Sequence, residues 1–136
     1  MRFRPIHVLL VGVCSTAAAL VSTYVAAQAL GNAGAARPVQ GDAGVFSSTV
    51  LDEPMFRAGR NYAAPGATRS LHRHGDVSFH IFILATGTLR LEVEGQNPRI
   101  IGAGEIVSIP TGANHTFTNI GGDTATFIEV FGKPPA

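Results

Sequence analysis

The sequence is poor in cysteine, tryptophan and charge, and each shortage excludes a class of protein. Its one cysteine, Cys14, lies in an apolar N-terminal segment, and there is no tryptophan. The chain beyond that segment therefore has no disulfide, no thiol nucleophile and no thiolate metal ligand. Only 14% of the 136 residues are charged, and ten Lys and Arg against nine Asp and Glu leave a net charge of +1. Binding to nucleic acid by charge alone needs clustered Lys and Arg, so we expect no nucleic-acid partner.

The first 29 residues have the pattern of an export signal. Arg2 and Arg4 are followed by an uncharged run rich in Val, Leu and Ala, and Ala27 and Ala29 supply the small residues of a cleavage site. We therefore predict a cleaved signal peptide over residues 1–29 and a periplasmic or secreted protein without stable membrane contact. The alternative is that residues 8–27 remain as a membrane anchor, because about twenty apolar residues can span a bilayer.

The rest of the chain predicts a linker followed by one all-β domain. Residues 30–44 are rich in Gly and Ala and show no periodicity, which predicts a flexible linker. From Val45 onward, short runs of β-favouring residues alternate with Gly, Pro, Asn and Asp, and no helical apolar stripe is present. We place the domain at residues 45–134, with strands near 45–51, 55–62, 68–73, 79–86, 88–94, 98–101, 105–109, 115–120 and 124–131. Many short strands without helices indicate a β-sandwich or barrel.

Strand alternation predicts which side chains face the interior. In residues 89–94, Leu or Val alternates with Arg or Glu, so the apolar members face a core and the charged ones face water. Gly87 separates two strand patterns and suits a tight turn. The same alternation gives the candidate interior walls Phe82, Leu84, Leu89, Leu91, Phe117 and Phe127, most of which we expect to serve in plain core packing.

Four histidines remain once the signal segment is set aside: His72, His74, His80 and His115. Residues two apart on a strand point to the same face, so His72 and His74 can reach one point. Neutral imidazole is a common ligand for Zn, Cu, Fe, Ni and Mn. A single histidine on a strand is more often a surface or hydrogen-bonded core residue, so the hypothesis of a metal site depends on the set of four.

Residues 66–119 resemble the two motifs of the cupin family. The first motif has Gly, five residues, His-x-His, then a Glu and a Gly seven positions after it; Gly66, His72, His74 and Gly87 fit it. The second has Gly, five residues, Pro-x-Gly, two residues, His, three residues and Asn, and it is matched in full by Gly104, Pro110, Gly112, His115 and Asn119. The resemblance implies a double-stranded β-helix, the jelly roll or cupin barrel, that binds one divalent transition metal.

The chain departs from the family at the position of the motif's Glu. His80 stands there, with one residue more than usual between it and His74. We favour His80 as a fourth ligand, because its spacing to Gly87 matches that of the family's Glu. The alternative is that Phe79, which cannot bind metal, fills the ligand position, leaving only His72, His74 and His115. Four neutral ligands would leave a divalent ion its full charge and make it a strong Lewis acid.

Two classes of function stay open. The first is an enzyme, a dioxygenase-like oxidoreductase whose small, oxygenated organic substrate chelates the metal; a metal-dependent lyase or isomerase is a variant, with Glu129 or Tyr62 as candidate catalytic proton carriers. The second is a non-catalytic module that binds a metal or small ligand. The metal ion is not distinguished among Mn, Fe, Cu, Ni and Zn. Cupins commonly pair through their sheet edges, so the resemblance also implies a homodimer, with residues 45–62 at the interface.

Overall fold

A computed structural model describes residues 35–135 of the chain, and within them every regular element is a β-strand. The strands are β1 (Arg37–Pro38), β2 (Val45–Asp52), β3 (Phe56–Ala63), β4 (Thr68–His72), β5 (His80–Thr86), β6 (Thr88–Val93), β7 (Arg99–Gly102), β8 (Ile106–Ile109), β9 (His115–Asn119) and β10 (Ala125–Gly132). The nine strands predicted from the sequence are confirmed to within one residue at each end. Among residues 35–135, no helix is long and apolar enough to cross a membrane. The predicted signal peptide, residues 1–29, and the alternative membrane anchor lie outside the described residues.

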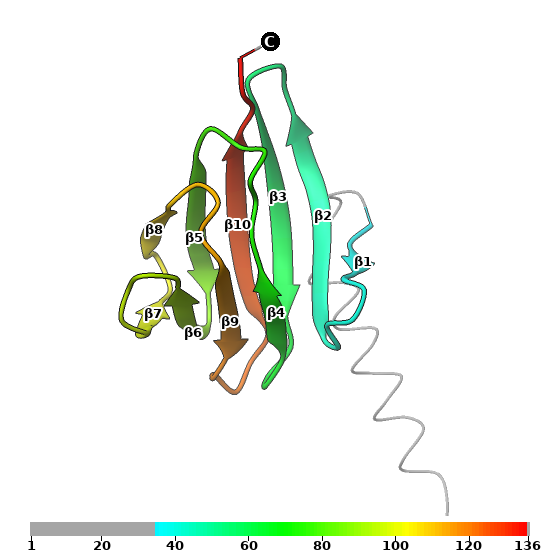
Figure 1. The fold of residues 1–136 in the computed structure, drawn as a ribbon. Helices are drawn as coiled ribbons and strands as arrows, with labels where there is room; N and C mark the ends of the chain where they lie inside the picture. Colours follow the sequence, from blue (N-terminus) through cyan, green and yellow to red (C-terminus); the bar gives the residue numbers. More distant parts are fainter. Residues whose placement is uncertain (1–34, 136) are drawn as a thin grey trace, which may run out of the picture. The chain divides into compact units, whose positions relative to one another are not determined.

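The strands form two antiparallel sheets that face each other (Figure 1). The larger has the order β1-β2-β3-β10-β5-β8, and the smaller has the order β4-β9-β6-β7. Strands far apart in sequence are therefore neighbours: β10 lies between β3 and β5, and β9 lies between β4 and β6. This is the double-stranded β-helix jelly roll that the resemblance to the cupin family implies.

The core fills the space between the sheets. Phe82, Phe117 and Phe127 pack with ring centroids 4.8–6.0 Å apart, and all three are at most 3% exposed. Leu84, Leu89 and Leu91 are also buried, so all six predicted wall residues are confirmed as interior. Aromatic and aliphatic burial of this extent is the main force that holds the two sheets together.

The folded region begins earlier than the sequence indicated. Residues 37–44, at the end of the predicted linker 30–44, include β1, which pairs with β2. Asp42 is 5% exposed, forms an ion pair with Arg69 and accepts a hydrogen bond from the Ser70 backbone N–H at 3.1 Å. The ion pair and the strand pairing order this stretch, although its Gly- and Ala-rich composition gives no periodic signal. The linker prediction is therefore corrected at this end.

Candidate metal centre

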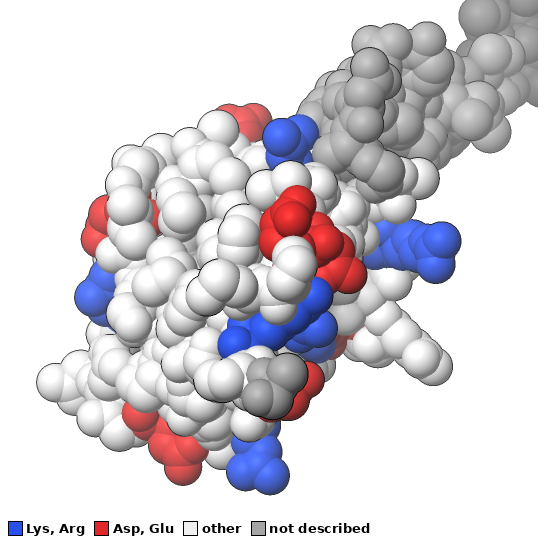
Figure 2. Space-filling view, turned by 90° about the horizontal axis from the view of Figure 1, so that it is seen from above, with Lys and Arg blue, Asp and Glu red and all other residues white. Residues whose placement is uncertain are grey.

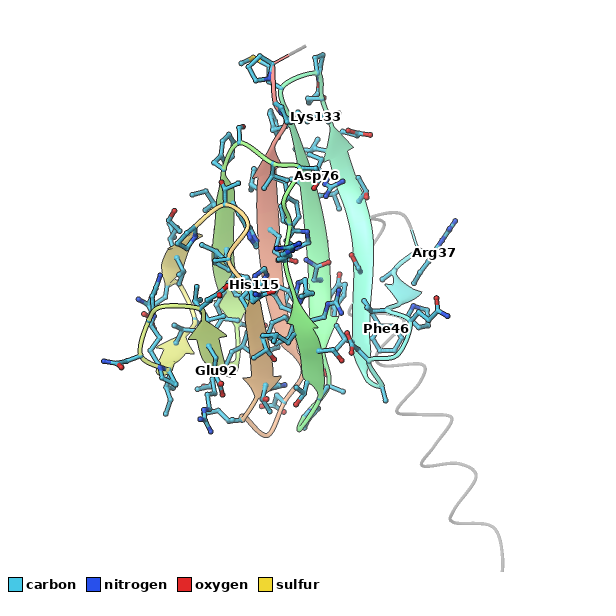
Figure 3. The ribbon with its side chains drawn as sticks, in the orientation of Figure 1. Arg37, Phe46, Asp76, Glu92, His115 and Lys133 are labelled. Carbon is cyan, nitrogen blue, oxygen red and sulfur yellow. The ribbon has the colours of Figure 1, made fainter. Side chains whose placement is uncertain are left out.

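The four histidines come from the ends of strands at one region of the barrel. His72 ends β4, His74 follows it in the loop, His80 begins β5 and His115 begins β9. Pairing of β4 with β9 sets His72 directly opposite His115, and pairing of β5 with β10 sets His80 opposite Phe131. His115, labelled in Figure 3, is only 1% exposed. The structure therefore brings the four predicted ligands to one place.

Three of these histidines form a tight group with a carboxylate. One ligand atom each from His74, His80, His115 and Glu129 lies within 4.8 Å of every other. His72 is outside this group but in contact with it, because its ring centroid lies 4.2 Å from that of His115 and 5.1 Å from that of His74. The geometry thus suits a metal ion with His74, His80, His115 and Glu129 as donors and His72 beside them.

Hydrogen bonds to the backbone orient two of the rings. Nδ1 of His115 donates to the Ala113 carbonyl at 3.0 Å, and Nδ1 of His72 donates to the Ser70 carbonyl at 2.8 Å. A proton on Nδ1 leaves Nε2 of a neutral ring with its lone pair, which is the form that binds a metal. Both rings are therefore held in the tautomer that a ligand needs.

Two imidazole nitrogens lack a partner, which provides a test of fit for a metal. Nε2 of His74 and Nε2 of His115 are buried and have no hydrogen-bond partner within the structure. Burial lowers the pKa of each of these imidazoles to about 4, so both are neutral at pH 7. A buried acceptor without a partner costs free energy, and a cation bound by both lone pairs would remove that cost. The residues present fit a metal ion.

Glu129 is the residue whose place in the cluster was not predicted. It lies on β10, its Oε1 accepts a hydrogen bond from Nε2 of His80 at 3.0 Å, and its Oε2 accepts one from Nδ2 of Asn61 at 2.8 Å. Burial pushes the pKa of this carboxyl upward, but the His80 hydrogen bond and the nearby imidazoles outweigh it, so the pKa lies below its usual value. Glu129 is therefore an anion at neutral pH.

The sequence contained a signal for this position. Phe127 and Phe131 flank Glu129 at the two-residue spacing of one strand face, and both are buried. An acidic residue on an inward-facing strand position needs a charged or hydrogen-bonding partner. The expectation of four neutral ligands is thus modified, because a carboxylate from β10 stands in the cluster while His80 occupies the motif position where the family has Glu.

The structure places the alternative ligands and the two candidate proton carriers at different distances from the cluster. His80 is 2% exposed and faces the cluster, whereas Phe79 is 44% exposed. Tyr62 neighbours Asn61 on β3, and strand alternation directs its side chain to the opposite face. The role of Tyr62 as a proton carrier therefore stays a prediction, while Glu129 belongs to the cluster.

A cavity of about 220 Å³ opens beside the histidines. His72, His74 and Glu129 are among its polar lining residues, and Phe117, Phe127 and Phe131 form apolar walls. This volume is below the ~300–1,000 Å³ typical of pockets for drug-sized ligands. The space suits a small molecule in contact with the cluster.

The Asn of the second motif has a structural role. Nδ2 of Asn119 donates to the carbonyls of Ala63 and Asp123, both at 2.8 Å, and its Oδ1 accepts from the Gly121 backbone N–H at 2.9 Å. Asn119 is 1% exposed, so these bonds satisfy a fully buried amide. They join the end of β9 to β3 and to the turn before β10, the strand that carries Glu129.

Charged side chains of both signs are mixed on the described part of the surface that Figure 2 shows. In Figure 2, Lys and Arg side chains are interspersed with Asp and Glu on a largely uncharged face. The exposed ion pairs Arg90–Glu92 and Lys133–Asp52 show the same mixing of signs. No contact with nucleic acid is indicated.

Comparisons with known proteins agree with this architecture. The profile of the Cupin domain matches residues 62–131, about half of the chain. No curated protein matches the sequence. Among solved structures, KdgF from Halomonas sp. is 20% identical with a TM-score of 0.66, over 77% of this chain and 93% of its own. A predicted oxalate decarboxylase from Thermotoga maritima is 22% identical with a TM-score of 0.64, over 73% and 92% of the two chains.

An oxalate oxidase is also similar, with 22% identity and a TM-score of 0.63, over 73% of this chain and 56% of its own. At these identities the likeness concerns the fold, and the domain match carries the assignment. The strand order, the histidine and glutamate cluster and the domain match lead to one statement: this chain belongs to the cupin family, with a side-chain cluster that fits a metal ion.

Proposed function

We propose that the protein is a metal-dependent enzyme, a dioxygenase-like oxidoreductase that acts on a small, oxygenated organic molecule chelated to the ion. The observation that carries the proposal is the pair of buried, unpartnered Nε2 atoms of His74 and His115, which belong to one cluster with Glu129. Of this cluster, His74 and Glu129 line a small cavity. A bound transition metal would supply Lewis acidity and redox chemistry, with dioxygen as the second substrate.

The residues of the chain have separate tasks in this proposal. His74, His80, His115 and Glu129 would hold the ion, and His72 stands beside His115 at the cavity wall. Phe117, Phe127 and Phe131 exclude water from one side of the cavity, which strengthens electrostatic interactions inside it. The similarity to an oxalate oxidase is consistent with oxygen-dependent chemistry on a small oxygenated molecule.

A second candidate function is a lyase or isomerase, and the position of Glu129 favours it. Its carboxylate is ionised and lines the cavity, and an ionised carboxylate can accept a proton from a substrate. Such a reaction needs no dioxygen. The similarity to a predicted oxalate decarboxylase is consistent with this alternative.

Metal analysis followed by oxygen uptake separates these functions. Protein purified without added metal is analysed for its elements, and uptake of oxygen is then measured with diketones, catechols and thiols. A redox-active metal with substrate-dependent oxygen uptake supports the oxidoreductase. Zinc without oxygen uptake, together with turnover of an enolisable substrate, supports the lyase or isomerase. Metal without any turnover supports a non-catalytic binding protein, and absence of metal in wild type overturns the metal-dependent proposals.

Export and dimer formation are further parts of the proposal. A cleaved signal peptide would place the mature protein in the periplasm or outside the cell, and N-terminal sequencing of protein from those fractions tests this. The apolar side chains of Leu51, Met55 and Phe79 are 50%, 78% and 44% exposed near the β2–β3 turn, which supports a homodimer through residues 45–62. Monomeric mass in light scattering would contradict the homodimer.

A further inference from the structure

Strand β3 forms one wall of the cavity, and none of the residues in the metal cluster lies on this strand. Arg57, Gly59 and Asn61 all line the cavity and follow one another at two-residue spacing, so they share the inward face of the strand. Glu129 pairs with Gly59 across the two strands. The wall therefore runs past the metal cluster, with a cationic side chain at one end and an amide at the other.

Arg57 brings a positive charge to this wall, and although this charge helps to lower the pKa of Asp52 across the β2–β3 pair, the ion pair of Asp52 is with Lys133. Its guanidinium carbon lies 4.9 Å from the ring centroid of Phe131, an arrangement that holds the side chain beside the cavity. In the part of the chain that the structure describes, no carboxylate forms an ion pair with Arg57. The other arginine of the cavity, Arg69, is paired with the buried Asp42. Arg57 is thus the cavity's cation available to an anionic ligand.

Asn61 brings an acceptor without a partner. Its Nδ2 donates to Glu129, and a carboxylate accepts hydrogen bonds, so this bond fixes which end of the amide faces Glu129. The remaining Oδ1 is buried without a hydrogen-bond partner on a residue that is only 4% exposed. An unsatisfied buried carbonyl is costly, and a ligand hydroxyl in the cavity would satisfy it.

Gly59 leaves space between these two groups. A Cβ at this position would lie 3.3 Å from the Ser48 carbonyl oxygen and 3.6 Å from Oδ1 of Asn61. A side chain here would therefore press on the Ser48 carbonyl, contact the Asn61 amide and occupy the strip of wall opposite Glu129. With glycine, a ligand can pass along the strand from the metal cluster to Arg57.

We propose that Arg57 and Asn61 select the substrate, and that the substrate is a small hydroxylated organic acid with two carboxylates. Its α-hydroxycarboxylate end chelates the ion, its hydroxyl donates a hydrogen bond to Oδ1 of Asn61, and its second carboxylate pairs with Arg57. The proposal rests on the proposed metal-dependent function. Arg57 and Asn61 bind and orient the molecule; they take no part in bond cleavage.

Calorimetry with Zn²⁺-loaded protein tests the proposal without turnover. The probes are malate, which has all three groups, 2-hydroxybutyrate, which lacks the second carboxylate, and succinate, which lacks the hydroxyl. We expect wild type to bind malate at least tenfold more tightly than either of the others, because charge-assisted and buried hydrogen bonds discriminate strongly.

Three variants assign the contacts, and a fourth serves as a control. Arg57→Gln should bind malate and 2-hydroxybutyrate equally, while Arg57→Lys should keep part of the preference. Asn61→Leu should reduce the advantage of malate over succinate. Arg60→Gln removes the same charge three positions further along β3, outside the cavity lining, and should behave as wild type. Circular dichroism and Zn²⁺ stoichiometry establish that each variant is folded and loaded.

The outcomes distinguish failure of the substrate proposal from failure of the proposed metal-dependent function. Failure of wild type to bind Zn²⁺ overturns the proposed metal-dependent function, and the substrate proposal with it. If wild type binds Zn²⁺ but does not prefer malate, or if Arg57→Gln keeps the full preference, the substrate class is wrong while the metal site stands. An unchanged ratio of malate to succinate affinity in Asn61→Leu overturns the role of Asn61 alone.

Discussion

His80 and Glu129 meet across two neighbouring strands, with Nε2 of the histidine 3.0 Å from Oε1 of the glutamate. His80 begins β5 and Glu129 lies in the middle of β10, 49 residues further along the chain. The family's first motif has a glutamate where this chain has His80. The carboxylate is therefore present in the site but comes from a different strand, which keeps a negative charge beside the three imidazoles.

The first prediction concerns the metal donors. His74→Ala and His115→Ala should each lower metal affinity by more than about 100-fold, because each removes a nitrogen from the tight group. His72→Ala should lower it less, because His72 lies outside that group. Isothermal titration with Zn²⁺ measures the three affinities. An equal loss of Zn²⁺ affinity in all three variants would show that His72 binds the ion as strongly as His74 and His115 do.

The second prediction concerns the charge of Glu129. Glu129→Gln keeps the size of the side chain but removes a negative charge beside the cation, and it should weaken metal binding about 10–100-fold. Glu92→Gln is the control, since Glu92 forms an exposed ion pair with Arg90 on β6. Zn²⁺ titration at fixed ionic strength measures both. If the two variants bind Zn²⁺ alike, the carboxylate does not act on the ion.

The third prediction concerns acid stability of the metal-free protein. His74 and His115 have pKa values of about 4 in the folded state, against 6.5 for an unperturbed histidine, mainly because of burial. The unfolded chain then binds more protons between these values, so the stability that these neutral rings contribute is present above pH 6.5 and is lost as the pH falls towards 4. The melting temperature should fall over this window, as differential scanning calorimetry would record.

A matched variant isolates this effect. His115→Asn removes one of the two depressed groups, so its melting temperature should decline less steeply between pH 6.5 and 4 than that of wild type. Parallel pH profiles for the two proteins would instead assign the acid sensitivity to other groups. Bound metal should shift the wild-type decline to lower pH, until protons compete for the imidazoles.

The fourth prediction concerns the turn between β5 and β6. Gly87 has a φ of +93°, and a Cβ there would lie 2.8 Å from Cβ of Ala125. Gly87→Ala should therefore lower the free energy of unfolding by about 2–4 kcal/mol, through backbone strain and a steric clash together. Gly104, with a φ of +90° and open space around it, is the control, and Gly104→Ala should cost only about 1–2 kcal/mol. Urea denaturation measures both, and equal losses would contradict the clash.

Much of the site followed from local pattern. The alternation of residues 88–94 and the glycines at turns predicted the strands, because strands depend on contacts between near neighbours and on a period of two. The jelly-roll fold was implied by the resemblance of the two motifs to the cupin family. The placement of Glu129 did not follow in the same way. Its partners His80 and Asn61 are 49 and 68 residues away, and only the pairing of β10 with both β3 and β5 brings them together.

The sequence by itself determined the all-β class, the strand positions and the presence of imidazoles on neighbouring strand ends, because each of these depends on the spacing of residues along the chain. The tertiary structure decided which groups share the cavity. It placed Glu129 among the histidines, set His72 at the edge of the tight group and drew residues 37–44 into the fold through Asp42. The physical reason is that sheet order and register join distant segments, and no periodicity within one segment encodes them.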